Sequence, residues 1–152
     1  MILDLLSVFL FSISPAGEAR VGIPIGIAKD IPVIWCFIVG LGANLLVFPV
    51  FHWLITVLNR FFWRYRTYKK SAVFVAKRAK KNTKKSIQKY GIWGLMVFVM
   101  IPLPVTGAYA GTIASYLLGM DYKKSFVATS IGVTISCIVV TLISYLVKNN
   151  LF

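Results

Sequence analysis

The sequence predicts an all-α integral membrane protein built from two inverted repeats. Each repeat is expected to contain a re-entrant helical hairpin followed by a transmembrane helix, with a basic amphipathic interfacial helix joining the two. Three observations lead to this prediction: a composition that is 59% hydrophobic and 14% charged, four long apolar blocks, and one strongly basic segment. Soluble domains are about 45–50% apolar and about 25% charged. The composition therefore excludes a disordered chain, a disulfide-rich secreted domain and an ordinary cytosolic enzyme.

The first apolar block, residues 1–29, is interrupted near its middle by proline and glycine. Proline removes a backbone donor and clashes with the preceding helical turn, so Pro15 and Pro24 are predicted to break the helix. The arms on either side of Pro15 are too short to cross a bilayer, because a spanning helix needs about 20 apolar residues. The block is therefore predicted to be either a re-entrant hairpin or one kinked span.

The second block, residues 31–58, contains no acidic or basic residue. It is long enough to cross a hydrocarbon core of about 30 Å, so it is predicted to be a transmembrane helix. Asn44 lies in the middle of this span beside Gly40 and Gly42. We expect Asn44 either to form an interhelical hydrogen bond or to contact a substrate.

The segment 60–89 carries 12 of the 17 basic residues and no acidic residue, so most of the net charge of +13 belongs to it. Aromatic and small residues recur on one helical face of the segment. A basic amphipathic helix of this kind lies in the membrane interface and attracts anionic lipid headgroups. Nucleic-acid binding is not expected, because the segment is tethered between spans and has no readout motif. The residues expected to contact headgroups are Arg64, Arg66, Lys69, Lys70, Lys77 and Arg78.

The third block, residues 91–120, is broken like the first, with Pro102 and Pro104 as predicted breakers, and the fourth, 125–147, is an uninterrupted apolar span. Paired broken helices in corresponding positions of two halves indicate an inverted repeat. An offset of 89 residues aligns the two halves, pairing Pro15 with Pro104, Ala19 with Ala108 and Gly22 with Gly111.

The charges also predict a topology. The positive-inside rule places the basic segment in the cytoplasm. If the third block is re-entrant, Lys123 and Lys124 return to the same side, which the rule favours. We therefore expect a multi-pass protein of the cell membrane with both termini outside the cytoplasm.

Glu18 and Arg20 are the only charges well inside the first block. An ionisable residue at membrane depth marks either a functional site or a buried ion pair. Glu18 is the predicted proton carrier, and Arg20 a predicted counter-charge or anion contact. Ser14 and Thr106 lie beside the breaking prolines and are predicted helix starts, so two helix N-termini suited to an anion are expected to meet. The candidate substrate-binding residues are Arg20, Ser14, Thr106, Gly107, Tyr109 and Asn44.

Neither the two cysteines nor the single histidine forms a metal-binding pattern. The sequence also lacks a Ser-His-Asp set, paired catalytic carboxylates and a phosphate-binding glycine loop. We therefore expect no metal, no cofactor and no enzymatic activity.

Residues 18–24 read EARVGIP and residues 102–108 read PLPVTGA. They are similar to the E-x-R-x-x-I-P and P-x-P-x-T-G-A motifs of small multidrug export proteins, a family that the chain resembles over essentially its whole length. That family looks like a compact relative of the DedA (SNARE-associated, VTT-domain) superfamily. The resemblance implies two re-entrant hairpins in an inverted repeat. It also implies transport, which in DedA relatives is proton-coupled or moves lipid phosphates. At the position that matches Arg20 under the offset of 89 residues, the second half has Tyr109 in place of an arginine.

The function expected from these features is that of a small secondary transporter or lipid translocase. Its substrate would bind between the two hairpin tips, and one repeat would rock against the other. Two alternatives remain open: a proton-coupled exporter of hydrophobic cations, and a non-transporting membrane assembly or membrane-shaping factor that acts through the basic helix. Because two helices and two hairpins shield only a small pathway, we expect a homo-oligomer. The other expected partners are membrane lipids and a small-molecule or lipid substrate.

Overall fold

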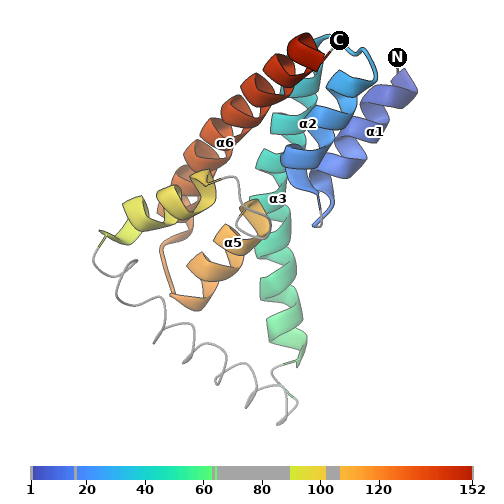
Figure 1. The fold of residues 1–152 in the computed structure, drawn as a ribbon. Coiled ribbons are helices and arrows are strands. Elements are labelled where there is room, and N and C mark those ends of the chain that lie inside the picture. Colours follow the sequence, from blue (N-terminus) through green and yellow to red (C-terminus); the bar gives the residue numbers. More distant parts are fainter. Residues whose placement is uncertain (1, 16, 63, 65–89, 102–106, 152) are drawn as a thin grey trace.

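The computed structural model describes residues 2–15, 17–62, 64, 90–101 and 107–151, and all regular structure in these ranges is helical (Figure 1). Each of two long helices follows a pair of short ones. The elements in chain order are α1 (Ile2–Ile13), α2 (Glu18–Ala28), α3 (Val33–Phe62), the short helix Tyr90–Met100, α5 (Ala108–Leu117) and α6 (Tyr122–Leu151).

The chain turns back on itself between α1 and α2. The carbonyl of Ser14 accepts hydrogen bonds from the N–H groups of Gly17 at 3.2 Å and Glu18 at 3.0 Å, and Pro15 lies in this turn as predicted. The two helices run antiparallel (Figure 1), and a methyl group at Gly22 would press on the backbone of α1. At about 1.5 Å per residue, neither α1 nor α2 is long enough to cross a core of about 30 Å.

Pro24 does not break α2, and this part of the prediction is wrong. The helix continues through Pro24 to Ala28. Proline cannot donate the hydrogen bond that residue 24 would make to the carbonyl of Arg20. However, α2 packs against α1, α3 and α6, and this packing holds its helical path despite one missing bond. Pro49 likewise lies inside α3.

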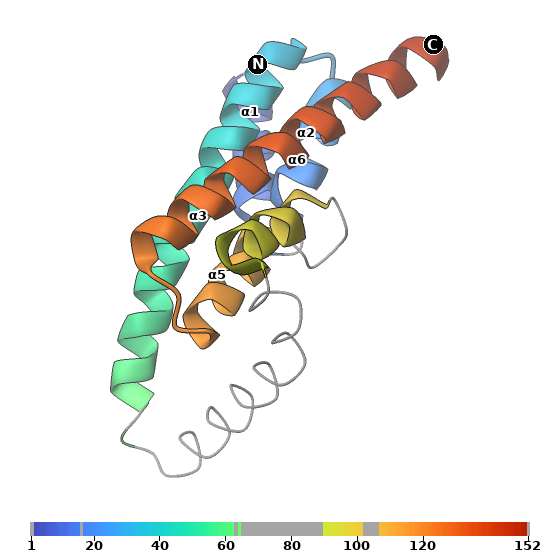
Figure 2. The same cartoon turned by 90° about the vertical axis from the view of Figure 1, so that its left-hand side faces the viewer.

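The long helices α3 and α6 have 30 residues each. Among the described helices, these two are long and apolar enough to cross a membrane. Both extend past the C-terminal ends of the predicted spans of 31–58 and 125–147, and the residues added there, including Arg60 and Lys148, remain helical. Long basic side chains can hold their charge at the membrane surface while their stems cover apolar surface. Figure 2 shows α6 crossing α3.

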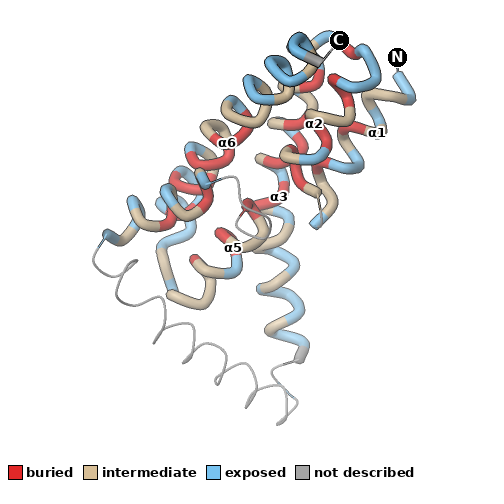
Figure 3. Tube along the Cα trace, in the orientation of Figure 1, coloured by how far each residue is buried: buried red, intermediate tan, exposed pale blue. Residues whose placement is uncertain are grey.

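Apolar side chains form most of the buried interior of the described helices, which also holds eight polar residues, and large apolar side chains cover much of the outside. Figure 3 shows the buried positions along the helix faces that point toward one another. This arrangement suits a hydrocarbon surrounding, in which polar side chains face protein. The buried polar residues are Ser12, Glu18, Asn44, Thr112, Ser115, Ser125, Thr129 and Ser136, and exposed apolar ones include Leu3, Leu10, Trp35, Trp53, Leu142 and Leu146.

Small residues mark the closest approaches between helices. A methyl group at Gly26 would press on the thiol of Cys36, and one at Gly111 would press on Val99. Small residues at four-residue spacing let membrane helices approach closely. Gly26 and Gly111 therefore allow close packing between helices. Cys36 and Cys137 are both buried as free thiols.

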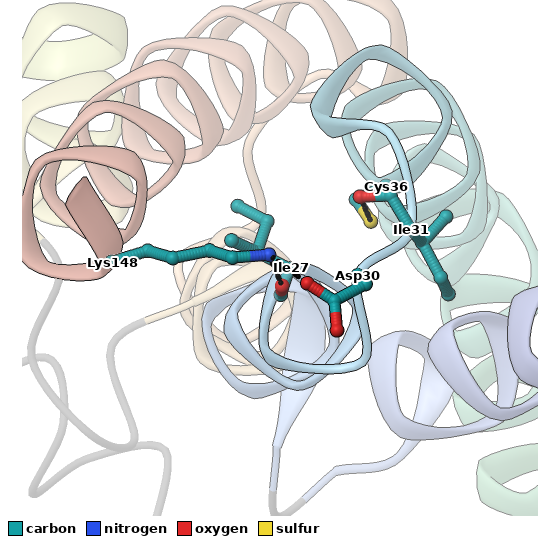
Figure 4. Close-up of polar contacts among 5 residues, drawn as sticks. All are labelled: Ile27, Asp30, Ile31, Cys36 and Lys148. Atoms are coloured by element: carbon teal, nitrogen blue, oxygen red, sulfur yellow. Dashed lines mark hydrogen bonds and ion pairs between the residues drawn. The ribbon is translucent and has the colours of Figure 1, made fainter. Parts of the chain in front are cut away.

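The end of α2 is tied to α6 by an ion pair (Figure 4). The ammonium of Lys148 donates to the carbonyl of Ile27 at 2.8 Å and to Oδ1 of Asp30 at 2.7 Å. Asp30 follows the helix with φ of 60°, a left-handed conformation usually taken by glycine at helix C-termini. The ion pair therefore joins the end of the first short pair to the C-terminal end of α6.

We expect this tie to weaken in acid. The hydrogen bond from Lys148 and its positive charge lower the pKa of the Asp30 carboxyl below its ordinary value of 3.8. A carboxyl whose pKa is lowered by folding stabilises the protein above the unfolded pKa, and this contribution is lost as the pH falls through the lowered value. As the pH falls below about 4, the denaturant concentration at the unfolding midpoint in detergent should therefore decrease more steeply for wild type than for Asp30→Asn. Identical acid profiles would contradict the prediction.

Candidate functional site

Glu18 begins α2 and directs its carboxylate at the N-terminus of α5. Its side chain is buried, with 7% of the residue exposed. Oε1 accepts a hydrogen bond from the N–H of Tyr109 at 3.4 Å, and the N–H of Ala108 also faces the carboxylate. The first N–H groups of a helix lack intrahelical partners and carry a positive partial charge, so a carboxylate is stabilised there. The second oxygen, Oε2, is buried and has no hydrogen-bond partner among the described residues.

Gly107 provides the space that the Glu18 carboxylate occupies. It caps the N-terminus of α5, and a methyl group added to it would overlap the carboxylate. Its φ of −86° is open to any residue, so glycine is needed here for room and not for conformation. The structure thus brings this predicted site residue into direct contact with the predicted proton carrier.

Arg20 connects α2 to the second half of the chain. Its Nη2 donates to the carbonyls of Val99 at 3.0 Å and Ile101 at 3.1 Å, and its Nε donates to Oγ of Ser136 at 3.2 Å. The two carbonyls lie at the C-terminal end of the helix Tyr90–Met100, where the helix dipole is negative. Arg20 therefore holds the short helix and α6 against α2.

Glu18, which is buried, and Arg20, which is half-buried, complement the two helix ends of the second broken block. Glu18 is negative at the positive start of α5, and Arg20 is positive at the negative end of the preceding short helix. Residues 91–120 contain no acidic or basic side chain of their own. Residues two positions apart do not share a helix face, and the structure gives each of these charges a different partner.

Tyr109 makes the reciprocal connection to the first half. Its phenol donates to the carbonyl of Ile13 at the end of α1, and its ring packs edge-on against Phe51 with centroids 4.8 Å apart. Under the offset of 89 residues, Tyr109 corresponds to Arg20 and Gly107 to Glu18. Each of Arg20 and Tyr109 reaches a carbonyl near the end of the short helix that opens the other half. The inverted repeat itself stays a prediction.

The other predicted site residues differ in their placement. Ser14 is not the N-cap of α2, because the turn continues to Gly17, which is the N-cap and forms no side-chain cap hydrogen bond. Asn44 is buried in α3, and its side-chain oxygen has no hydrogen-bond partner among the described residues. The two expected roles of Asn44, an interhelical hydrogen bond or a substrate contact, stay predictions.

Several predictions fall outside the described residues. They concern the helix start at Thr106, the breakers Pro102 and Pro104, and the lipid contacts of Arg66, Lys69, Lys70, Lys77 and Arg78. Arg64 is described and exposed. Across the described ranges, no three His, Cys, Asp or Glu side chains gather closely enough to hold a metal ion.

Sequence reasoning missed Ser136 and the pair of Asp30 and Lys148. Ser136 is one of many Ser and Thr residues in α6, and nothing in its spacing marks it as the partner of Arg20. The pair lies 118 residues apart in the sequence, and single charges at the ends of apolar helices are common.

The fold and the site define a helical membrane protein in which short helices meet around a buried carboxylate. The sequence model of the family "Putative small multi-drug export protein" matches residues 18–139, so the chain belongs to that family. The match begins at Glu18 and includes the second broken block. Together with the two apolar helices, this membership indicates a membrane location and a transporter rather than an enzyme. No curated protein and no solved structure gives a match.

Proposed function

We propose that the protein is an exporter that exchanges protons for hydrophobic organic cations at Glu18. The observation that carries this proposal is the buried Oε2 oxygen, to which no described residue donates, while Oε1 is held by the start of α5. A carboxylate placed in this way can bind a proton or the positive charge of a ligand, but not both at once. Such competition couples proton entry to cation release.

A cationic substrate is better supported than an anionic one. A substrate phosphate or carboxylate would need Arg20, whose guanidinium is held by two carbonyls and by Ser136. The N-terminus of α5, a natural anion site, already faces the carboxylate of Glu18. Translocation of lipid phosphates, which a relationship to DedA proteins would suggest, therefore ranks behind cation export.

The proposed cycle uses movement of one half against the other. Residues 1–62 and 90–151 form the two proposed inverted repeats, with α1–α2 and the second short pair as re-entrant hairpins. Neutralising Glu18 would remove its attraction for the start of α5 and free the two halves to separate. In Figure 1 both termini lie at one end of the molecule, and α3 ends at the other. This supports a cytoplasmic basic segment and external termini. A homo-oligomer would cover the site from lipid.

The test is transport by the purified protein in liposomes. Tetraphenylphosphonium should accumulate when a proton gradient is imposed, and Glu18→Gln should reduce this accumulation to the level of liposomes without protein. Glu18→Asp should keep part of the activity, because it retains a carboxylate. Asp4→Asn removes a half-exposed carboxylate from α1 and should transport like wild type.

Two results would overturn the proposal. One is wild-type, gradient-dependent transport by a folded Glu18→Gln protein. The other is the absence of transport in wild type together with loss of cellular function when Lys69, Lys70 and Lys77 are neutralised, which would favour the assembly factor acting through its basic segment.

A further inference from the structure

The seam between α2 and α6 is bridged at two points with a cavity between them. At one point Arg20 bonds Ser136, and at the other Lys148 bonds the end of α2. The intervening cavity has a volume of about 660 Å³ and mostly apolar walls. Its wall residues are Pro24, Ile27, Ala28, Ile143, Ser144 and Val147, and Asp30 and Lys148 complete the lining.

The end of this cavity is built to hold a cation. The carboxylate of Asp30 and the carbonyl of Ile27 converge on one ammonium group at 2.7 and 2.8 Å (Figure 4). The carbonyl belongs to the last turn of α2, where the helix dipole is negative. Asp30 adopts a left-handed backbone conformation that glycine would adopt more easily, so its carboxylate is held here at some cost in conformational energy.

The cation that fills these acceptors belongs to the chain itself. Lys148 carries its ammonium on a flexible four-carbon stem, and the Asp30 side chain is 87% exposed. The ion pair therefore has ready access to its surroundings, and exposed pairs of this type are weak. A ligand that combined a positive charge with an apolar body would match both the acceptors and the cavity walls.

We propose that this cavity is a second binding site, specific for hydrophobic amines, in which the ligand's ammonium replaces that of Lys148. The ligand's N–H groups donate to Asp30 and to the Ile27 carbonyl, and its apolar body lies against Ile143 and Val147. Lys148 is a tethered competitor that fills the acceptors when no ligand is bound. The choice of a cation as ligand rests on the proposed function, whereas the site itself is inferred from its hydrogen-bond acceptors and its apolar walls.

The test uses the full-length protein in lipid nanodiscs and the probe 4-phenylbutylamine, with binding to empty nanodiscs subtracted. Lys148→Met removes the competitor and should bind the amine at least about fivefold more tightly than wild type. Asp30→Asn keeps the turn, because asparagine accepts the left-handed conformation, and should bind at least about tenfold more weakly. Ser144→Phe fills the cavity and should also lose binding. Lys124→Gln, at the other end of α6, should match wild type.

The proposal predicts opposite changes in amine affinity for Lys148→Met and Asp30→Asn. If the ion pair were purely structural, the loss of either partner would change the affinity in the same direction. A variant that merely folds poorly cannot gain affinity, so the gain in Lys148→Met remains a test if Asp30→Asn is unstable. Equal amine affinity in wild type, Lys148→Met and Asp30→Asn would overturn the proposal. So would a cavity that takes no amine and instead retains phospholipid that Ser144→Phe displaces.

The failures of the two proposals are distinguishable. If Glu18→Gln abolishes transport while Asp30→Asn and Ser144→Phe bind the amine like wild type, the second site is wrong and the exporter stands. If Glu18→Gln transports normally while the amine affinities follow the predicted pattern, the exchange mechanism at Glu18 is wrong and the second site stands.

Discussion

Gly107→Ala should lower the free energy of unfolding by about 1–3 kcal/mol and sharply reduce transport. The new methyl group would overlap the carboxylate of Glu18, which is buried against the start of α5 and cannot move into solvent. Either the carboxylate or the helix must shift, and both shifts lengthen the hydrogen bond from the Tyr109 N–H. Denaturant unfolding in mild detergent measures the stability, and uptake by liposomes measures the activity.

A second substitution identifies the cause of this effect. In a Glu18→Ala background the overlap is absent, so Gly107→Ala should cost much less than it does alone, and the two effects should not add. Gly42→Ala is the matched control, because nothing lies within 4 Å of a methyl group at Gly42. It should be neutral or stabilising, since alanine has the higher helix propensity. Additive effects at positions 18 and 107 would contradict the assigned overlap.

Arg20→Met should lower the free energy of unfolding by about 2 kcal/mol. Methionine retains most of the side-chain volume but leaves the carbonyls of Val99 and Ile101 without the donor that holds them. A hydrogen bond to a charged group contributes about 1.5–3 kcal/mol, and because Arg20 is half-buried we expect the total loss to be about that of one such bond. The same unfolding measurement in detergent checks this value.

Arg20→Lys should fall between wild type and Arg20→Met, because one ammonium cannot reproduce the fork of a guanidinium. Arg60→Met, an exposed position in α3, controls for the loss of a positive charge. If Arg20→Met is as stable as wild type but fails to transport, then Arg20 acts on the substrate and not on the contact between the halves. That result would favour an anionic substrate over a cationic one.

The order of the elements was predictable because it depends on local properties of the chain. Pro15 lacks an N–H and ends a helix, and 28 residues without a charge form a long apolar helix in any membrane context. Pro24 has the same chemistry as Pro15, yet α2 passes through it. Packing on three sides decides that outcome, and a single sequence does not reveal such packing.

The candidate site was predictable in its residues but not in its contacts. Charges inside an apolar block identified Glu18 and Arg20, because burial of a charge needs a reason. Their partners are a backbone N–H, two backbone carbonyls and one serine hydroxyl. Backbone groups are present at every position, so no sequence pattern could have distinguished these. The start of α5, where we expected the anion of a substrate, faces the carboxylate of Glu18.

The contact between Glu18 and Gly107 has a consequence for how the two halves relate. In the proposed inverted repeat, Glu18 and Gly107 are equivalent positions, and equivalent positions that touch lie near the two-fold axis. A symmetric pair there would place two carboxylates against each other or leave two helix starts without a carboxylate. One acid opposite one gap avoids both arrangements. Under the proposed repeat, the chain resembles a heterodimer fused into one polypeptide, whose halves are complementary at this contact. In the proposed transport cycle, the inward-open and outward-open forms need not have equal free energies, because only one half carries the acid.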